Sequence, residues 1–286
     1  MPDLPLDFSA ISQLYCARAY QLSCVKGIDS SSPATDFGGA VHKFVEARGL
    51  GDTRSAIVIC SELSTKYKAP LDKLIMCAVK IDLVYKFGPP LLDTQSTPLI
   101  EYKFSIPYRE MDGYNIILCG TIDRIEYRNN CLVFPDWKTT ACTGAALERA
   151  MSEYANSFQL PFYLYIIHKY LSKFLPPDLE KAALSLNMSG IYRYICHSFN
   201  PVDIRESSEI YLSPEDILYI EELIDYCIPK MISIHKRNTL CPPEGSIYKM
   251  CPKCNFRDLC AIRNHDRLID TINKQPTRKY DPTNFR

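Results

Sequence analysis

The stretch of sequence that decides the fold is residues 114–140, which read YNIILCGTIDRIEYRNNCLVFPDWKTT. Apolar residues alternate with polar ones through much of this stretch, and a period of two is typical of β-strands. The turn-forming pair DG at 112–113 precedes it, and the pair NN at 129–130 divides it. Together with the similar run at 99–108, the pattern predicts an antiparallel meander of three strands.

The sequence before the meander has the spacing of helices. Apolar residues recur at helical intervals over residues 8–50 and 53–87. A Ser/Pro/Gly-rich interruption at 29–39 is expected to form a loop between two helices. The first third of the chain is therefore predicted to be mostly α-helical.

Helices and strands alternate after the meander. Residues 152–174 have helical spacing, and residues 185–197 read as a further strand. Ser213 is a candidate N-cap for a helix through about residue 236, with Asp216 completing an acidic variant of the capping box. A strand that follows a helix indicates a mixed sheet, so the predicted fold class is α/β, a central mixed β-sheet flanked by helices.

The composition favours one sizeable core. The chain has 286 residues, of which 47% are apolar, and shows neither repeats nor a low-complexity linker. We expect a single domain over residues 1–265, followed by a basic tail over 266–286. The domain is expected to consist of a helical part (about 1–97), a sheet core (about 98–200) and a C-terminal helix with a cysteine-rich segment (about 213–265).

Charge and hydropathy limit the possible partners. Lysine plus arginine equals aspartate plus glutamate, 33 against 33, so any binding of a polyanion depends on a local patch. No basic segment followed by an apolar run stands at the N-terminus, and no stretch is long and apolar enough to span a bilayer. We expect a cytoplasmic or otherwise intracellular protein that is not secreted and does not bind a membrane.

Two acids and a lysine form a candidate catalytic cluster. Asp136 and Lys138 lie two residues apart in a predicted strand, so their side chains share a face, and Asp123 ends the preceding strand. Hydrolysis of a phosphodiester uses carboxylates to hold Mg²⁺ or Mn²⁺ and a lysine to position water or offset developing charge. Taken alone, the same pattern also fits a surface hairpin with solvated charges.

The thirteen cysteines favour metal ligation over disulfides, because no secretory signal accompanies them. Cys251, Cys254 and Cys260 have the spacing C-x2-C-x5-C, which is a soft-metal site with one ligand missing. Most other cysteines, such as Cys60 and Cys119, stand among apolar neighbours and are expected to be small buried side chains.

The chain also carries four short motifs in order: FGGAVHKFVEA at 37–47, GTIDRIEY at 120–127, DWKTT at 136–140 and SFQLPFYLY at 157–165. Together they resemble the RecB-like branch of the PD-(D/E)xK nucleases, which includes AddB-type recombination nucleases and the exonucleases associated with CRISPR adaptation. The resemblance implies a restriction-endonuclease-like core.

The resemblance also implies roles for individual residues. His42, Asp123, Asp136 and the backbone carbonyl of Trp137 would hold the metal, and Lys138 would be the catalytic lysine. The imidazole among oxygen ligands shifts the preference from Mg²⁺ toward Mn²⁺.

Three further residues on helices have two interpretations each. Gln159 and Tyr163 match the QxxxY element of the branch, which contacts DNA and supports the active site, although Tyr163 also suits the core of an amphipathic helix. Glu46 lies one turn after His42 and could orient it, or could be a solvated helix charge.

The fourth cysteine ligand comes from the N-terminus in this branch, within a stretch like ISQLYCARAYQLS at 11–23, which places Cys16 there. Ala17 follows it where the branch usually has proline, and Cys24 and Cys241 are rival ligands. The resemblance favours a [4Fe–4S] cluster with a structural role. Tetrahedral zinc is the alternative, because four cysteines serve either metal.

The function that follows is metal-dependent hydrolysis of DNA, expected to be exonucleolytic and directed at single-stranded or free ends. Recombination, repair or processing of foreign DNA would be its setting, with other subunits of such a complex as possible partners. Two alternatives use the same sequence features: a catalytically idle DNA-binding or scaffold subunit, and a zinc-stabilised interaction module.

Overall fold

The computed structural model describes residues 1–28, 32–88, 93–94, 97–98, 100–128, 131–170, 187–242, 244, 254 and 256–260. The chain divides into two compact units. Unit 1 comprises Met1–Ser31, Lys103–Gly120 and Leu218–Arg286, and unit 2 comprises Ser32–Tyr102 and Thr121–Ile217. The expected single domain over 1–265 stays a prediction, and the basic tail at 266–286 lies outside the described residues.

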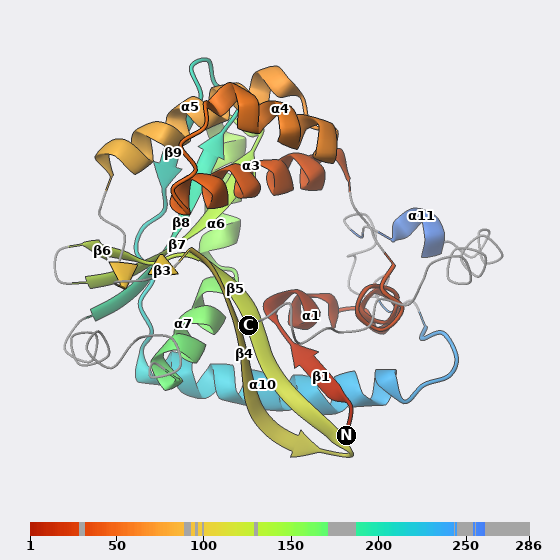
Figure 1. Cartoon of the computed structure of the whole chain (residues 1–286). Coiled ribbons are helices and arrows are strands. Elements are labelled where there is room, and N and C mark those ends of the chain that lie inside the picture. The colour runs from red at the N-terminus through yellow and green to blue at the C-terminus, as the bar shows by residue number, and fades with distance from the viewer. Residues whose placement is uncertain are drawn as a thin grey trace. The chain divides into compact units, whose positions relative to one another are not determined.

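Unit 2 contains a four-stranded mixed sheet in the order β6-β7-β8-β9 (Figure 1). The strands are β6 (Glu126–Arg128), β7 (Cys131–Thr140), β8 (Asn187–Cys196) and β9 (Asp203–Glu206). β7 and β8 are parallel, and the pairs β6/β7 and β8/β9 are antiparallel. The predicted mixed α/β fold is confirmed.

Helices cover both faces of this sheet. The helices α3 (Pro33–Gly49), α4 (Ala56–Tyr67) and α5 (Leu71–Phe87) share one apolar core with Trp137 and Ile195. Helices α6 (Gly144–Ala155) and α7 (Gln159–Lys169) pack with the alternate residues of β8, Tyr192, Tyr194 and Cys196. Neighbouring residues of β7 and β8 therefore face different helical layers.

The loop expected at residues 29–39 is wrong over 33–39, where α3 already begins. Ser32 caps this helix, because its hydroxyl accepts a 3.2 Å hydrogen bond from the amide of Thr35, and Pro33 occupies the first helical position. The serine and proline that suggested a loop are here the start signals of a helix. The part of the expected loop at 29–31 lies outside the described residues.

The predicted meander is only partly correct. Its first two strands, β4 (Ile100–Met111) and β5 (Tyr114–Arg124), pair with each other, but β5 ends before Ile125 and β6 begins after it. β6 then pairs with β7 in the other sheet. The three predicted strands are thus shared between two sheets, and the break falls where the chain buries the charged side chains of Arg124 and Glu126.

Unit 1 contains a short sheet and the two ends of the described chain. β1 (Asp3–Leu6), which the sequence did not predict, pairs in parallel with β5, so that the sheet order is β1-β5-β4. The other elements of this unit are α1 (Phe8–Gln13), α2 (Ala17–Tyr20), the π-helix η1 (Gln21–Val25), most of α10 (Pro214–His235) and α11 (Arg257–Cys260).

Unit 2 also contains a second, smaller sheet. β2 (Asp93–Thr94) and β3 (Thr97–Pro98) form a two-stranded antiparallel sheet within unit 2.

The predicted capping box of α10 is confirmed, since the amide of Asp216 donates to Ser213 and the amide of Ser213 donates to Asp216. None of the described helices is both long and apolar enough to cross a membrane.

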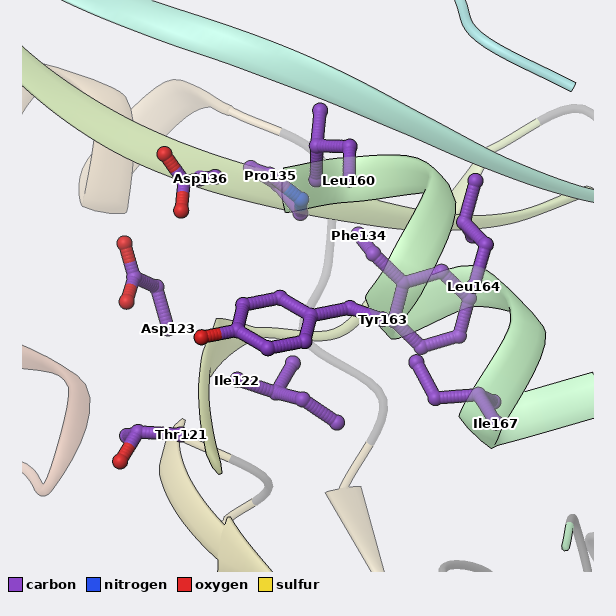
Figure 2. Close-up of a pocket in the computed structure, with 10 residues that line it drawn as sticks. All are labelled: Thr121, Ile122, Asp123, Phe134, Pro135, Asp136, Leu160, Tyr163, Leu164 and Ile167. Carbon is purple, nitrogen blue, oxygen red and sulfur yellow. The ribbon is translucent and has the colours of Figure 1, made fainter. Parts of the chain in front are cut away.

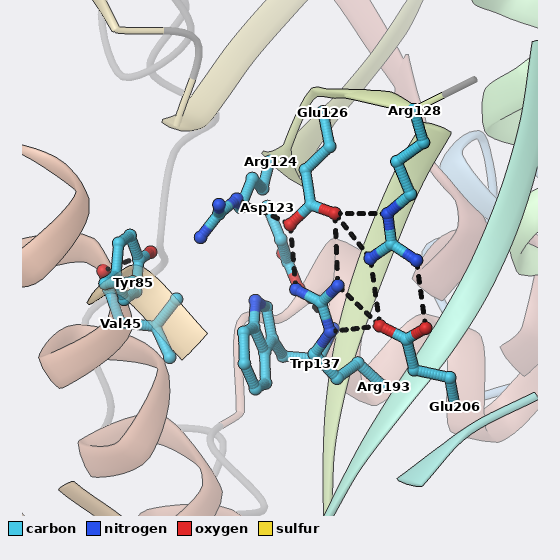
Figure 3. Close-up of polar contacts among 9 residues, drawn as sticks. All are labelled: Val45, Tyr85, Asp123, Arg124, Glu126, Arg128, Trp137, Arg193 and Glu206. Carbon is cyan, nitrogen blue, oxygen red and sulfur yellow. Dashed lines mark hydrogen bonds and ion pairs between the residues drawn. The ribbon is translucent and has the colours of Figure 1, made fainter. Parts of the chain in front are cut away.

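A partly buried arginine–glutamate network lies beside β7 (Figure 3). Its members are Arg124, Glu126, Arg128, Arg193 and Glu206. Glu126 is fully buried and accepts from Arg193 at 2.9 and 3.1 Å, and Arg128 and Arg193 both also bind Glu206. The guanidinium of Arg193 stands 4.8 Å from the centre of the Trp137 ring. The network therefore holds one side of the indole by a stacked cation.

The ion pairs of Glu206 in this network make the stability of the fold depend on pH in the acid range. Burial would raise the pKa of Glu206, but Arg128 and Arg193 outweigh burial and lower it from 4.5 to about 2. A carboxyl whose folded pKa is depressed stabilises the fold above its unfolded pKa, and this contribution is lost as the pH falls through the folded value. The free energy of unfolding should therefore fall between about pH 4.5 and about pH 2.

Urea unfolding at a series of acid pH values measures this dependence. Glu206→Gln should give a flatter profile than the parent, whereas Glu215→Gln, in the exposed first turn of α10, should keep the parental slope. Identical slopes for the parent and Glu206→Gln would show that the network contributes nothing to the acid sensitivity.

Candidate functional site

β7 presents the predicted catalytic residues on one face and Trp137 on the other. Asp136 and Lys138 are partners of Tyr192 and Tyr194 in the register with β8, and both tyrosines belong to the α6/α7 side of the sheet. The Trp137 indole is fully buried in the core with α3, α4 and α5. This alternation places the Trp137 peptide between the two side-chain layers.

The Trp137 peptide is bound at both polar groups. Its N–H donates to Asp123 Oδ2 at 2.8 Å, and its carbonyl accepts from His42 Nε2 at 2.8 Å. Because a carbonyl can only accept, Nε2 of His42 carries a proton in this arrangement. The structure thus brings together His42 from α3, Asp123 from β5 and Trp137 from β7, the three residues that the resemblance implied as metal ligands together with Asp136.

Glu101, which the sequence analysis missed, completes this group. The Nδ1 atom of His42 lies 3.6 Å from Asp123 Oδ2 and 3.8 Å from Glu101 Oε1. One ligand atom from each of these three residues lies within 4.8 Å of the others, and in the described part of the chain this is the one such group of three or more. Glu101 stands second in β4, and its position gave no signal beyond an acidic residue at the start of a predicted strand.

Two features of Glu101 set it apart from a surface carboxylate. Its backbone has a φ of +47°, a conformation that is uncommon for a residue with a side chain. Its Oε1 atom is buried and accepts no hydrogen bond. A buried carboxylate oxygen without a hydrogen bond is costly, so the position fits a ligand that binds a cation.

Asp136, Lys138 and Gln159 form a second, adjoining group. Lys138 Nζ lies 2.6 Å from Asp136 Oδ2 and donates to Gln159 Oε1 at 2.9 Å, while Gln159 Nε2 donates to Asp136 Oδ1 at 3.0 Å. Each oxygen of Asp136 thus has a partner, Lys138 for Oδ2 and Gln159 for Oδ1. Gln159 therefore anchors both the acid and the lysine from the first turn of α7.

Tyr163, the second residue of the QxxxY element, lies at the edge of the same site. Figure 2 shows its ring beside Ile122 and its hydroxyl directed toward Asp123, with Asp136 on the other side of that carboxylate. The ring lines a small, mostly apolar pocket with Leu160 and Leu164. Pro161 is the third residue of α7, where the helix needs no amide donor.

The acids of the site are short of positive charge. Burial raises the pKa of both Asp123 and Asp136, and His42 and Lys138 offset this only in part. Burial would lower the pKa of His42, but Asp123, Glu101 and Asp136 raise it to about 9. The donor set of carboxylates, one imidazole and one carbonyl fits a divalent cation that takes oxygen and nitrogen ligands.

Glu46, which the sequence analysis considered as a residue that orients His42, has another partner. Its carboxylate pairs with Lys43 on the same helix. Of the two interpretations of Glu46, the ordinary helix charge is the one that this contact supports.

Three of the four predicted cluster cysteines are described, and they gather in unit 1. Cys16 is buried at the N-cap of α2 in one small core with Cys254 and Phe256. Burial raises the pKa of Cys260, Arg18 offsets this in part, and the neighbouring Cys16 and Cys254 add to the rise. Crowded thiols that disfavour each other's charge fit a site that is neutralised by metal. Cys251 lies outside the described residues.

The two rival ligands have different surroundings. Cys241 is buried near Cys16, and its carbonyl accepts from Arg18, whose guanidinium also approaches Cys260 Sγ at 3.7 Å. Cys24 lies near Asp7 and Tyr20, and burial raises the pKa of its thiol to about 12. Cys241 therefore lies near Cys16, whereas the neighbours of Cys24 are the carboxyl of Asp7 and the phenol of Tyr20.

Comparison with known proteins identifies the family. A family model described as the PD-(D/E)XK nuclease superfamily matches residues 9–261, which include both the acidic group and the gathered cysteines. Fifteen chains of solved structures match, among them one titled "Crystal structure of SSO0001", with 16% identity and a TM-score of 0.34; the match covers 78% of this chain and 94% of that chain. No curated protein sequence matches. The chain belongs to the PD-(D/E)XK nuclease superfamily, which indicates a metal-dependent nuclease with DNA as its substrate.

Proposed function

We propose that this protein is a Mn²⁺- or Mg²⁺-dependent deoxyribonuclease that cleaves phosphodiester bonds at the group formed by His42, Glu101, Asp123, Asp136 and Lys138. The observation that carries the proposal is the set of buried acidic oxygens around His42, of which Glu101 Oε1 has no hydrogen-bond partner. Such a set is stabilised by a cation and is otherwise costly inside a fold.

The metal ligands in this proposal are His42, Glu101, Asp123, Asp136 and the carbonyl of Trp137. When bound, a divalent cation would polarise the phosphate and acidify a water molecule. His42 would offer its Nδ1 atom, which faces Asp123 and Glu101, while its Nε2 atom binds the Trp137 carbonyl at 2.8 Å. Tyr163 is proposed to support the site from the side of Asp123.

Lys138 is proposed to act on the reacting water or on the charge that develops on the phosphate. Its ammonium is held by Asp136 and Gln159, so it stands at a fixed place beside the acids. Burial would lower the pKa of Lys138, but Asp136 outweighs it and the pKa is raised, so the side chain is a cation. A fixed cation stabilises developing negative charge without reorganisation.

Exonucleolytic action on single-stranded or free ends is our preferred mode, and recombination, repair or processing of foreign DNA the preferred setting, with other subunits of such a complex as possible partners. The resemblance to the RecB-like branch supports these proposals. An intracellular location accords with them, because the reduced thiols of unit 1 need a reducing compartment.

We further propose that Cys16, Cys251, Cys254 and Cys260 hold a [4Fe–4S] cluster that stabilises unit 1. The gathering of Cys16, Cys254 and Cys260 supports the proposal, and so does Arg18, which can donate to a cluster sulfur. Zinc on the same four thiols is the alternative. The two metals differ in colour, since only the iron cluster absorbs visible light strongly.

A catalytically idle DNA-binding or scaffold subunit is the second candidate function. Retention of Asp123, Asp136 and Lys138 opposes it, since a buried group of this kind is costly to keep without a use. The cleavage experiment separates the two.

Asp136→Asn tests the catalytic assignment. It keeps the shape of the side chain but removes a charge, so metal-dependent cleavage of end-labelled single-stranded DNA should fall by about a hundredfold or more. The matched control is Asp203→Asn, which breaks an ion pair with Arg205 on β9 and should cleave like the parent. A parental rate in Asp136→Asn would mean that the reaction occurs elsewhere.

Glu101→Gln tests the ligand that only the structure revealed. Loss of this carboxylate charge should weaken binding of Mn²⁺, measured by isothermal titration calorimetry, by about tenfold or more. Glu46→Gln, on the same helix as His42 but paired with Lys43, should bind Mn²⁺ as the parent does. If both variants bind equally well, Glu101 is not a ligand.

Cys16→Ser and Cys24→Ser test the cluster. A link from Cys16 to Cys251 closes a loop of about 235 residues, and loss of such a cross-link costs up to about 5 kcal/mol in the chain-entropy treatment. Cys16→Ser should therefore lose the visible absorbance and melt at a markedly lower temperature, while Cys24→Ser should keep both. A coloured Cys16→Ser protein would move the fourth ligand to another cysteine, with Cys241 the first to test.

A further inference from the structure

Aromatic rings surround the ammonium of Lys138. Its Nζ atom stands 5.6 Å from the centre of the Tyr154 ring and 5.7 Å from that of the Tyr192 ring. Both distances are within the range of a cation–π contact. The catalytic face of β7 is therefore bordered by carboxylates on one side and by tyrosines from α6 and β8 on the other.

Tyr154 differs from the other rings of this group because it is accessible. Tyr192 and Tyr194 are fully buried, whereas Tyr154 is 40% exposed. The ring centre of Tyr154 lies 5.6 Å from that of Tyr192 and 6.0 Å from that of Tyr194, in tilted contacts. The Tyr154 ring thus contacts the two tyrosines of β8 and Lys138, while part of the residue is exposed.

The wall behind Tyr154 is fixed by hydrogen bonds. The hydroxyl of Tyr192 pairs with the hydroxyl of Ser157 at 2.6 Å, and the hydroxyl of Tyr194 donates to the carbonyl of Met151 at 3.4 Å. These bonds tie β8 to the end of α6 and to the segment after it. Tyr154 is consequently an exposed ring on a rigid support, which is the arrangement that costs least entropy on binding a ligand.

We propose that Tyr154 is a stacking platform for an unpaired nucleobase of the nucleotide that carries the scissile phosphate or of its immediate neighbour. The inference rests on the proposed function, because it takes Lys138 to stand beside the reacting phosphate. The ring centre of Tyr154 lies 5.6 Å from Lys138 Nζ, so the ring would stand next to a phosphate bound at that lysine. The platform would bind any base, since every base has a π-face.

The charge of the protein also favours stacking as a source of affinity. The chain has no net charge, and the acids beside Lys138 repel a phosphate backbone in the absence of cations. A contribution from base stacking does not depend on phosphate charge. It also discriminates between substrates, because a base in a duplex is already paired and stacked and cannot offer its face to Tyr154.

The experiment measures binding and cleavage of single-stranded DNA in parent, Tyr154→Ala, Tyr154→Phe and Tyr154→Leu proteins. Binding is followed by the anisotropy of a fluorescein-labelled oligothymidylate in Ca²⁺, and one abasic nucleotide is moved along the strand. Tyr211→Ala is the matched control, because Tyr211 is an exposed tyrosine of unit 2 that binds Glu209.

Tyr154→Ala should weaken binding of the intact strand by about 5- to 100-fold, Tyr154→Leu by nearly as much, and Tyr154→Phe not at all. One abasic position should weaken binding by the parent but make no further difference to Tyr154→Ala. Tyr211→Ala should bind like the parent. Thermal melts and Mn²⁺ affinity establish that each variant keeps the fold and the metal site.

Three outcomes would contradict the proposal that a nucleobase stacks on Tyr154. They are parental affinity in Tyr154→Ala, equal affinity of Tyr154→Leu and Tyr154→Phe, or a loss in Tyr154→Ala that is the same at every abasic position. In each case Tyr154 only shields Lys138 from water. A parent that neither binds nor cleaves DNA would instead refute the proposed function, so the two failures are distinguishable.

Discussion

The peptide of Trp137 is the constraint on which the site depends. Its indole is fully buried in the core with α3, α4 and α5, and the guanidinium of Arg193 stacks on it, so the backbone at this point of β7 is fixed from one side of the sheet. On the same residue the amide holds Asp123 and the carbonyl holds His42. Because side chains alternate along a strand, the flanking Asp136 and Lys138 both project from the opposite face of the sheet. Core packing and catalytic geometry are therefore one arrangement, because the same residue takes part in both.

Unit 2 contains two clusters of charged side chains that differ in their balance of positive and negative charge. The arginine–glutamate network has three arginines against two glutamates, and its two carboxylates are shared among the guanidinium groups in close ion pairs. The other group sets three acids, Glu101, Asp123 and Asp136, against two cations, Lys138 and His42. The excess of positive charge in the first network calls for no further cation, whereas the excess of buried acid in the second group is offset when a cation binds. This contrast is the physical reason to place function at the second group.

Local signals predicted what depends on local structure. The alternation in residues 131–140 placed Asp136 and Lys138 on one face, and Ser213 with Asp216 predicted the start of α10. Features that depend on distant contacts were missed or misplaced. Glu101 joins His42 only because β4 and α3 meet in three dimensions, and the break at Ile125 separates two sheets whose strands look continuous in sequence. The proximity of Cys16 to Cys254 has no local signal at all and was expected only from the resemblance.

The order of the segments explains why a cross-link would matter in unit 1 more than in unit 2. Unit 2 consists of two long segments, Ser32–Tyr102 and Thr121–Ile217, and has its own apolar cores on both faces of its sheet. Unit 1 is assembled from both ends of the chain and one short hairpin segment, Lys103–Gly120. In the unfolded chain, bringing its two terminal segments together closes a loop that contains all of unit 2, and that closure costs entropy. Thiols from each terminal segment, Cys16 from one and Cys254 and Cys260 from the other, lie where a shared metal would offset that cost.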